Sequence, residues 1–160
     1  MSLHPLRFYT LAFLIGIVAG LRSMTAPAAV SWAARLGWLR LEDTWLAFLG
    51  FAATPYIFTL AAIAELITDK LPKTPSRKSP LGFGARLVTG AISGGALGAA
   101  NQNLIGGLLA GVLGAIPGTL GGYEFRVRLV KAIAGKDLPI ALLEDAIAIA
   151  IAILVVSRFS

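Results

Sequence analysis

The segment from Pro139 to Ser157 is apolar except for two adjacent carboxylates, Glu144 and Asp145, and its terminal serine. Its length suits a membrane-spanning helix, which needs about 20 apolar residues. An ionised side chain near the bilayer centre costs roughly 2.5–3.5 kcal/mol on insertion scales. Two acids that persist in such a segment need a partner, a water-filled cavity or a proton. Glu144 and Asp145 are therefore the first candidates for a functional site.

The composition is that of a membrane protein. The chain is 57% hydrophobic and 14% charged, whereas a soluble domain has about 25% charged residues. We predict an all-α polytopic membrane protein, with residues 1–160 forming a single integral membrane domain. The chain has no cysteine and a single histidine, His4, so we expect no disulfide, metal or cofactor, and enzymatic activity is not indicated. The net charge of +6 resides in short loops, so nucleic acid is not a predicted partner.

Five apolar segments are long enough to be spans, and we place them at roughly 7–23, 44–67, 83–100, 104–123 and 138–157. Pro27 follows the first segment and interrupts the helix there. Residues 26–38 are then predicted to form a short interfacial or re-entrant helix. Two arrangements remain open: about five transmembrane helices, or four with a re-entrant N-terminal hairpin.

Positive charge predicts the orientation of these spans. Two loops are basic, whereas the turn at residues 101–103 carries no charge. Cytoplasmic loops are enriched in Lys and Arg, so we predict that both basic loops and the N-terminus are cytoplasmic and that the C-terminus lies outside. Basic side chains near the membrane also attract anionic headgroups, for which the candidates are Lys73, Arg77 and Lys78.

Glycine and proline are concentrated where helices are expected to pack or break. Thirteen of the eighteen glycines lie between Gly82 and Gly122. Small residues at four-residue spacing let membrane helices approach closely, so we predict a tightly packed central hairpin or close contacts between copies. Pro55 and Pro117 fall inside the second and fourth predicted spans. They indicate either ordinary kinks or broken helices that line a site.

The remaining intramembrane charges are predicted to gather near one side of the bilayer. Glu65, Asp69 and Arg86 lie at helix ends on the same side as Glu144 and Asp145, whereas Arg22 falls at the opposite end of the first span. Neighbouring helical residues point about 100° apart, so we expect the two acids to have different partners. One is expected to pair with an arginine, Arg86, and the other to bond a helix terminus or face water. The cluster is either a set of ion pairs that locks helix order or a transport site, and acid–base catalysis is a weaker third interpretation.

Several stretches resemble a family of small bacterial integral membrane proteins that has no established biochemistry. They are AGLR at residues 19–22 followed by Pro27, AELITDKLP at 64–72, RLVTGA at 86–91, and LED at 143–145 with the apolar tail. The resemblance implies an all-helical protein of the bacterial inner membrane and no particular activity. The positions that match the family's polar residues are Arg22, Glu65, Asp69, Lys70, Arg86, Glu144 and Asp145.

Two functions follow as expectations. One is a small homo-oligomeric transporter or channel for an ion or small polar solute, with an intramembrane carboxylate and arginine site. The other is a structural or lipid-interacting membrane scaffold whose buried charges only fix helix packing. The transport interpretation rests on ionisable groups inside apolar segments, which are functional candidates by default.

Overall fold

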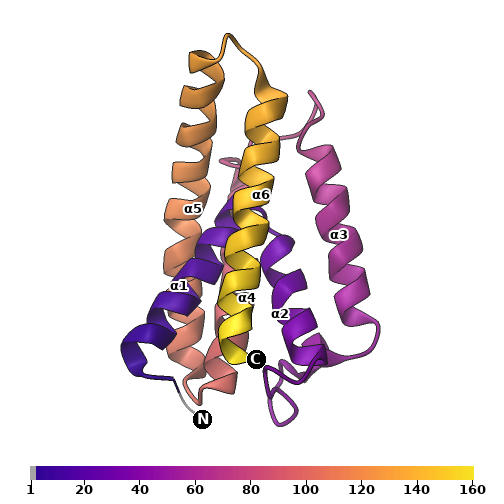
Figure 1. Ribbon diagram of the computed structural model, residues 1–160, viewed down its shortest axis with the longest axis vertical. Helices are drawn as coiled ribbons and strands as arrows, with labels where there is room; N and C mark the ends of the chain where they lie inside the picture. Colours follow the sequence, from indigo (N-terminus) through magenta and orange to yellow (C-terminus); the bar gives the residue numbers. More distant parts are fainter. Residues whose placement is uncertain (1–2) are drawn as a thin grey trace.

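The computed structural model describes residues 3–160, and every regular element in this part of the chain is a helix (Figure 1). The all-helical prediction is confirmed. The α-helices are α1 (Pro5–Leu21), α2 (Thr25–Arg35), α3 (Thr54–Thr68), α4 (Pro80–Ala100), α5 (Leu104–Ala132) and α6 (Asp137–Val156). Two short 3₁₀ helices, η1 (Ala47–Gly50) and η2 (Ser157–Phe159), complete the described chain.

Two helical segments are long and apolar enough to cross a membrane. They are α5, with 29 residues, and the continuous segment Asp137–Phe159 that contains α6. The helices α1 and α3 are apolar but have 17 and 15 residues. The glycine-rich α4 has 21 residues but is less apolar than α5 and α6. By length and composition two segments therefore qualify, and the five-span prediction is not confirmed.

The first two helices form a hairpin whose tip lies midway along the bundle. Helix α1 ends at Leu21, residues 22–24 form the break, and α2 returns towards the end from which α1 came (Figure 1). The backbone of Gly20 lies directly against Ala115 and Thr119, near the middle of α5. Pro27 lies in the first turn of α2, so the helix break falls just before it. A helical hairpin of this shape fits the second predicted arrangement, and its placement in a bilayer stays a prediction.

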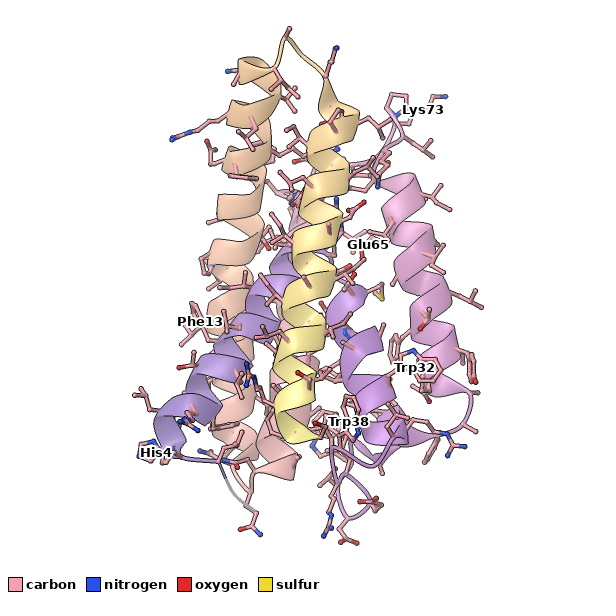
Figure 2. The ribbon with its side chains drawn as sticks, viewed as in Figure 1. His4, Phe13, Trp32, Trp38, Glu65 and Lys73 are labelled. Carbon is pink, nitrogen blue, oxygen red and sulfur yellow. The ribbon has the colours of Figure 1, made fainter. Side chains whose placement is uncertain are left out.

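The N-terminal end of the described chain lies away from the basic loops. The Leu3 N–H donates to Oδ1 of Asn101 at 2.7 Å, and Nδ2 of Asn103 donates to the Tyr9 hydroxyl at 2.9 Å. Both ends of the described chain lie at this end of the molecule, while Lys73 lies at the other (Figures 1 and 2). The described chain therefore begins at the end of the molecule opposite the basic loops, because the first segment turns back at mid-height. The side of the membrane on which the N-terminus lies stays a prediction.

The second predicted span is shorter than expected at its N-terminal side. Residues 47–50 form η1, and α3 begins at Thr54, so Pro55 occupies the first helical turn. Proline is tolerated there because its missing N–H has no intrahelical partner in any case. The prediction that Pro55 breaks a helix is wrong. Pro117 does lie inside α5, where it leaves the Leu113 carbonyl without its usual donor.

Glycines place α5 between α4 and α1. A Cβ built at Gly111 would overlap the carbonyl oxygen of Gly90 on α4, and a Cβ at Gly16 on α1 would overlap the carbonyl oxygen of Gly111. Side chains are therefore excluded from both contacts, and the backbones touch. The predicted tight packing of the glycine-rich hairpin, formed by α4 and α5, is confirmed. The participation of α1 as a third helix in this contact was not predicted.

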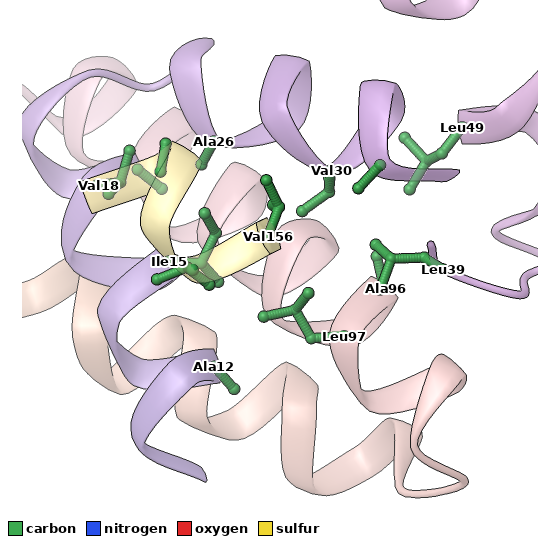
Figure 3. Close-up of a cluster of buried hydrophobic side chains, with 14 of the residues drawn as sticks. Ala12, Ile15, Val18, Ala26, Val30, Leu39, Leu49, Ala96, Leu97 and Val156 are labelled. Carbon is green, nitrogen blue, oxygen red and sulfur yellow. The ribbon is translucent and has the colours of Figure 1, made fainter. Parts of the chain in front are cut away.

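Apolar side chains fill the space between the α1–α2 hairpin and the longer helices (Figure 3). Among the fully or almost fully buried ones are Ile15, Val18, Val30, Leu97 and Val155. Large apolar side chains also cover the outer surface of the bundle: Leu60 and Ile67 on α3, Leu109 and Leu113 on α5, and Ile153 and Leu154 on α6. Exposed apolar side chains of this kind are compatible with a membrane protein.

Candidate functional site

Arg22 lies at the break between α1 and α2 and is completely buried. Its guanidinium contacts three carboxylates. Nε donates to Oδ1 of Asp145 at 2.6 Å, Nη1 donates to Oδ2 of Asp69 at 2.8 Å, and Nη2 lies 3.4 Å from Oε2 of Glu144. Arginine suits this position because its planar group presents five donors in fixed directions. One side chain thus joins the hairpin tip to α6 and to the end of α3.

The two adjacent acids of α6 also bind separate cations. Arg77 donates to both oxygens of Glu144, at 2.6 and 3.2 Å. Lys70 donates to Oδ2 of Asp145 at 2.6 Å. The expectation of different partners therefore holds for Arg77 and Lys70, but Arg22 contacts both acids. The structure thus brings Glu144 and Asp145 into one cluster with several cations.

A second layer of ion pairs lies nearer the basic end of the bundle. Arg126 donates through Nη1 to Oδ2 of Asp69 at 2.6 Å, and through Nε and Nη2 to the two oxygens of Asp137 at 2.8 and 2.7 Å. Burial alone would raise the pKa of Asp69, but the charge of Arg22 and the hydrogen bond from Arg126 outweigh it. The pKa of Asp69 is therefore held below its ordinary value of 3.8.

Glu65 anchors the start of α2. Its carboxylate accepts hydrogen bonds from the Ser23 N–H, the Ser23 hydroxyl and the Met24 N–H, each at 2.8 Å. Unpaired N–H groups at a helix start favour such a negative charge. Arg86 lies 3.7 Å from Glu65 and donates to the carbonyl oxygens of Gly20 and Gly82. Figure 2 shows Glu65 on the inner side of α3, facing the bundle.

Three sequence predictions about these charges are wrong. Arg86 does not pair with Glu144 or Asp145 but lies beside Glu65. Arg22 does not lie apart at an outer helix end but at the centre of the cluster, because α1 stops at mid-height. Arg77 is 7% exposed and paired with Glu144, so it is not free to bind a lipid headgroup.

Two further members of the cluster, Arg126 and Asp137, were not among the predicted site residues. Arg126 lies in the last third of α5, and Asp137 is the first residue of α6. Their only sequence signal is that charges of opposite sign lie on the two sides of a short connection. Lys70 was singled out by the family resemblance alone. Lys73 and Lys78 remain candidates for headgroup contact, although Lys78 also lies 3.3 Å from Glu124 and stacks over Tyr123.

We call the connected set of charges the ion-pair network. We include in it the neighbouring pair of Glu65 and Arg86, which is not joined to the rest by an ion pair. The network then has five carboxylates and five cations: Glu65, Asp69, Asp137, Glu144 and Asp145 with Arg22, Lys70, Arg77, Arg86 and Arg126. The formal charges cancel, which is what burial of charge in an apolar bundle requires. Within residues 3–160, no three Asp, Glu or His side chains are grouped so that they could hold a metal ion.

A pocket of about 460 Å³ opens beside the network at the basic end of the bundle. We call it the basic-end pocket. Four network members form part of its wall: Asp69, Arg77, Arg126 and Asp137. Its other lining residues are Thr74, Ser76, Tyr123, Val127, Val130 and Lys131. A solute in this pocket could therefore contact the network directly.

A second, apolar groove reaches the network from the flank of the bundle. It has a volume of about 280 Å³ and is bounded by α1, α5 and α6, with Pro117, Gly121 and Phe125 among its lining residues. Glu144 is its one charged lining residue. The network is thus bordered by a polar pocket at one end and by an apolar groove at its side.

Comparison of this chain with protein-family models, with curated proteins and with solved structures found no match. The resemblance to small bacterial membrane proteins stays a prediction.

Proposed function

We propose that this chain is an integral membrane protein of the bacterial inner membrane, with α3 to α6 crossing the bilayer and the α1–α2 hairpin entering from one side. The basic loops would be cytoplasmic by the positive-inside rule, and both ends of the described chain would then lie on the opposite side. The exposed apolar side chains of α3, α5 and α6 support this placement. Helix α3 is about 22 Å long at 1.5 Å per residue, so local thinning of the bilayer would accompany it.

We further propose that the protein moves an ion or a small polar solute through the region of the ion-pair network. The observation that carries this proposal is that Asp69, Arg77 and Arg126 belong both to the network and to the wall of the basic-end pocket. A route from one membrane face would thus reach charges at a helix break. Transporters commonly place their sites where interrupted helices meet near the bilayer midplane, and Arg22 lies at such a break.

The transporter is proposed to act as a homo-oligomer. One copy supplies few helices from which to build the walls of a path. The apolar groove that ends at Glu144 opens on the flank of the bundle, where a second copy would close it. Exposed apolar side chains next to this groove, such as Phe125 and Leu113, support a contact of this kind.

A scaffold function is the second candidate, and one specific observation favours it. The network is neutral and each of its carboxylates has a cation within 4.0 Å. Such pairs are sufficient to fix the arrangement of the helices without any role in transport. Removal of one partner of a buried pair is costly even when the intact pair adds little stability. In this case Lys73 and Lys78 would provide contacts to anionic lipid headgroups.

Reconstitution into liposomes separates the two candidates. We expect the wild-type protein to carry protons, a metal cation or an anion faster than protein-free liposomes do. Glu144→Gln should lower this flux while the protein still elutes as an assembled species. Glu124→Gln is the matched control, because Glu124 is half-exposed and lies outside the network. A wild-type flux equal to that of empty liposomes would exclude transport of the solutes tested and favour the scaffold.

A further inference from the structure

We infer that the basic-end pocket binds an oxyanion, a carboxylate or phosphate group, on Arg126 in the place that the Asp137 carboxylate now occupies. This inference rests on the proposed function where it treats the pocket as the entrance to the network. It adds the chemical class of the ligand and the residue that the ligand displaces. The source of the oxyanion is a small soluble anion or the headgroup of an anionic lipid.

The pairing of Arg126 with Asp137 already has the geometry of a bound oxyanion. Nε and Nη2 of Arg126 donate in parallel to the two carboxylate oxygens, at 2.8 and 2.7 Å. This fork is the arrangement by which arginine recognises carboxylates and phosphates. Asp137 is therefore an internal stand-in for such a ligand, attached to the first turn of α6.

The exposure of the two partners shows which one can leave. The side chain of Asp137 is 50% exposed, whereas that of Arg126 is 15% exposed. Arg126 is also held from behind by Asp69 at 2.6 Å. The bidentate pair is strong while it is intact, but water and dissolved ions reach the half-exposed Asp137 carboxylate. A competing anion can therefore take the place of this carboxylate and form the same two hydrogen bonds, while Arg126 stays in place.

The charge of the pocket selects an anion over a cation. Its lining includes three cations, Arg77, Arg126 and Lys131, and two carboxylates, Asp69 and Asp137. Lys131 has no ion-pair partner among the side chains of residues 3–160. When Asp137 swings outward, the network retains five cations against four carboxylates, and an arriving anion restores neutrality.

Hydroxyl groups complete the site. Ser76 and Tyr123 line the same pocket, as does Thr74, whose hydroxyl already donates to the Thr68 carbonyl oxygen. The Ser76 hydroxyl accepts a hydrogen bond from the Lys78 N–H at 3.2 Å, so its own proton is available to a ligand. A volume of about 460 Å³ lies within the range of small-molecule sites and accommodates an ion of the size of phosphate or succinate.

Binding measurements on the purified full-length protein test the inference. Inorganic phosphate and succinate are titrated by calorimetry against the wild type, Asp137→Asn, Arg126→Gln and the control Glu124→Gln. Asp137→Asn should bind at least about tenfold more tightly than the wild type, because the competing carboxylate has been removed. Arg126→Gln should lose binding, and Glu124→Gln should match the wild type. Thermal unfolding of each variant verifies that it is folded.

A second arm identifies the source of the oxyanion. The same four proteins are mixed with vesicles of phosphatidylcholine alone and with vesicles that also contain phosphatidic acid. Preference for phosphatidic acid that increases in Asp137→Asn and disappears in Arg126→Gln supports a headgroup ligand. The same pattern with soluble phosphate or succinate supports a small anion as ligand.

Two results would overturn the inference. One is equal affinity of the wild type, Asp137→Asn and Arg126→Gln for every anion tested, and the other is absence of binding in folded Asp137→Asn. The proposed transport function fails separately. If Arg126-dependent binding is found but neither anions nor cations cross the membrane of the liposomes, the oxyanion site stands and transport of the solutes tested is excluded. If cation flux occurs without anion binding, transport stands and the oxyanion site is excluded.

Discussion

Arg22 Nε donates to Oδ1 of Asp145 across 2.6 Å, although 123 residues separate the two positions in the chain. The contact joins the tip of the α1–α2 hairpin to the middle of the bundle, where Arg22 also lies near Glu144 and Lys70 binds Asp145. A buried charge of either sign is costly on its own. The hairpin tip and α6 therefore hold each other in position through this pair.

Removal of the arginine should be strongly destabilising. Arg22→Leu would leave Asp145 and Asp69 short of a cation in a buried site, and loss of one partner of a buried pair costs about 3–5 kcal/mol. Denaturant unfolding in detergent micelles measures the free energy of unfolding. Arg40→Leu is the control, because Arg40 is exposed and surface changes stay within about 0.5 kcal/mol. Similar losses for the two variants would contradict a structural role for Arg22.

The stability should depend on pH through Asp69. Its pKa in the folded protein is below 3.8, so folding favours the ionised form. The resulting stabilisation is fully present above the unfolded-state pKa and is lost as pH falls through the folded-state pKa. Asp69→Asn should therefore lower the melting temperature at neutral pH, and the gap to the wild type should narrow below about pH 4.

Melting curves recorded from about pH 7 to pH 3 test this dependence on Asp69. Glu42→Gln serves as the control, because Glu42 is exposed and outside the network. Its melting temperature should follow that of the wild type throughout. A gap between Asp69→Asn and the wild type that stays constant or widens in acid would show that the ionised carboxylate does not stabilise the fold.

Two glycines on the same helix should respond in opposite ways to the same substitution. A Cβ at Gly111 would overlap the backbone of Gly90, so Gly111→Ala forces α4 and α5 apart, and overpacking of this kind costs about 1–3 kcal/mol or more. A Cβ at Gly121 meets nothing within 4 Å, so Gly121→Ala should be neutral or stabilise by up to about 1 kcal/mol. Unfolding of both variants in detergent measures the difference. Equal effects would argue against direct backbone contact at Gly111.

The sequence was informative wherever one segment determines its own structure. Apolar length predicted α4, α5 and α6 to within a few residues at most ends, although α5 continues to Ala132 beyond the predicted 123. The glycine spacing predicted the α4–α5 contact because close approach leaves no room for side chains. These properties are local and are therefore readable from the residues alone.

The sequence was uninformative wherever the structure depends on how far one segment reaches into the bundle formed by the others. An apolar segment of 17 residues is compatible with a span and with half of a hairpin, so the depth of Arg22 could not be fixed. An arginine in a basic loop has the same sequence signal whether it faces headgroups or enters the bundle, as Arg77 does. The partners of Glu144 and Asp145 were mispredicted for these two reasons.

The arrangement of the hairpin predicts which loops share a side of the membrane. The chain has no cysteine, so single cysteines can be introduced and labelled without background. His4→Cys and Gln102→Cys should react with a membrane-impermeant thiol reagent from one side, and Lys73→Cys and Lys136→Cys from the other. All four positions are exposed. Spheroplasts give access to the periplasmic side alone, and inverted vesicles give access to the cytoplasmic side, where we expect the two lysine positions to react. Labelling of His4→Cys and Lys73→Cys from the same side would mean that α1 crosses the bilayer completely, and the re-entrant hairpin would then be wrong.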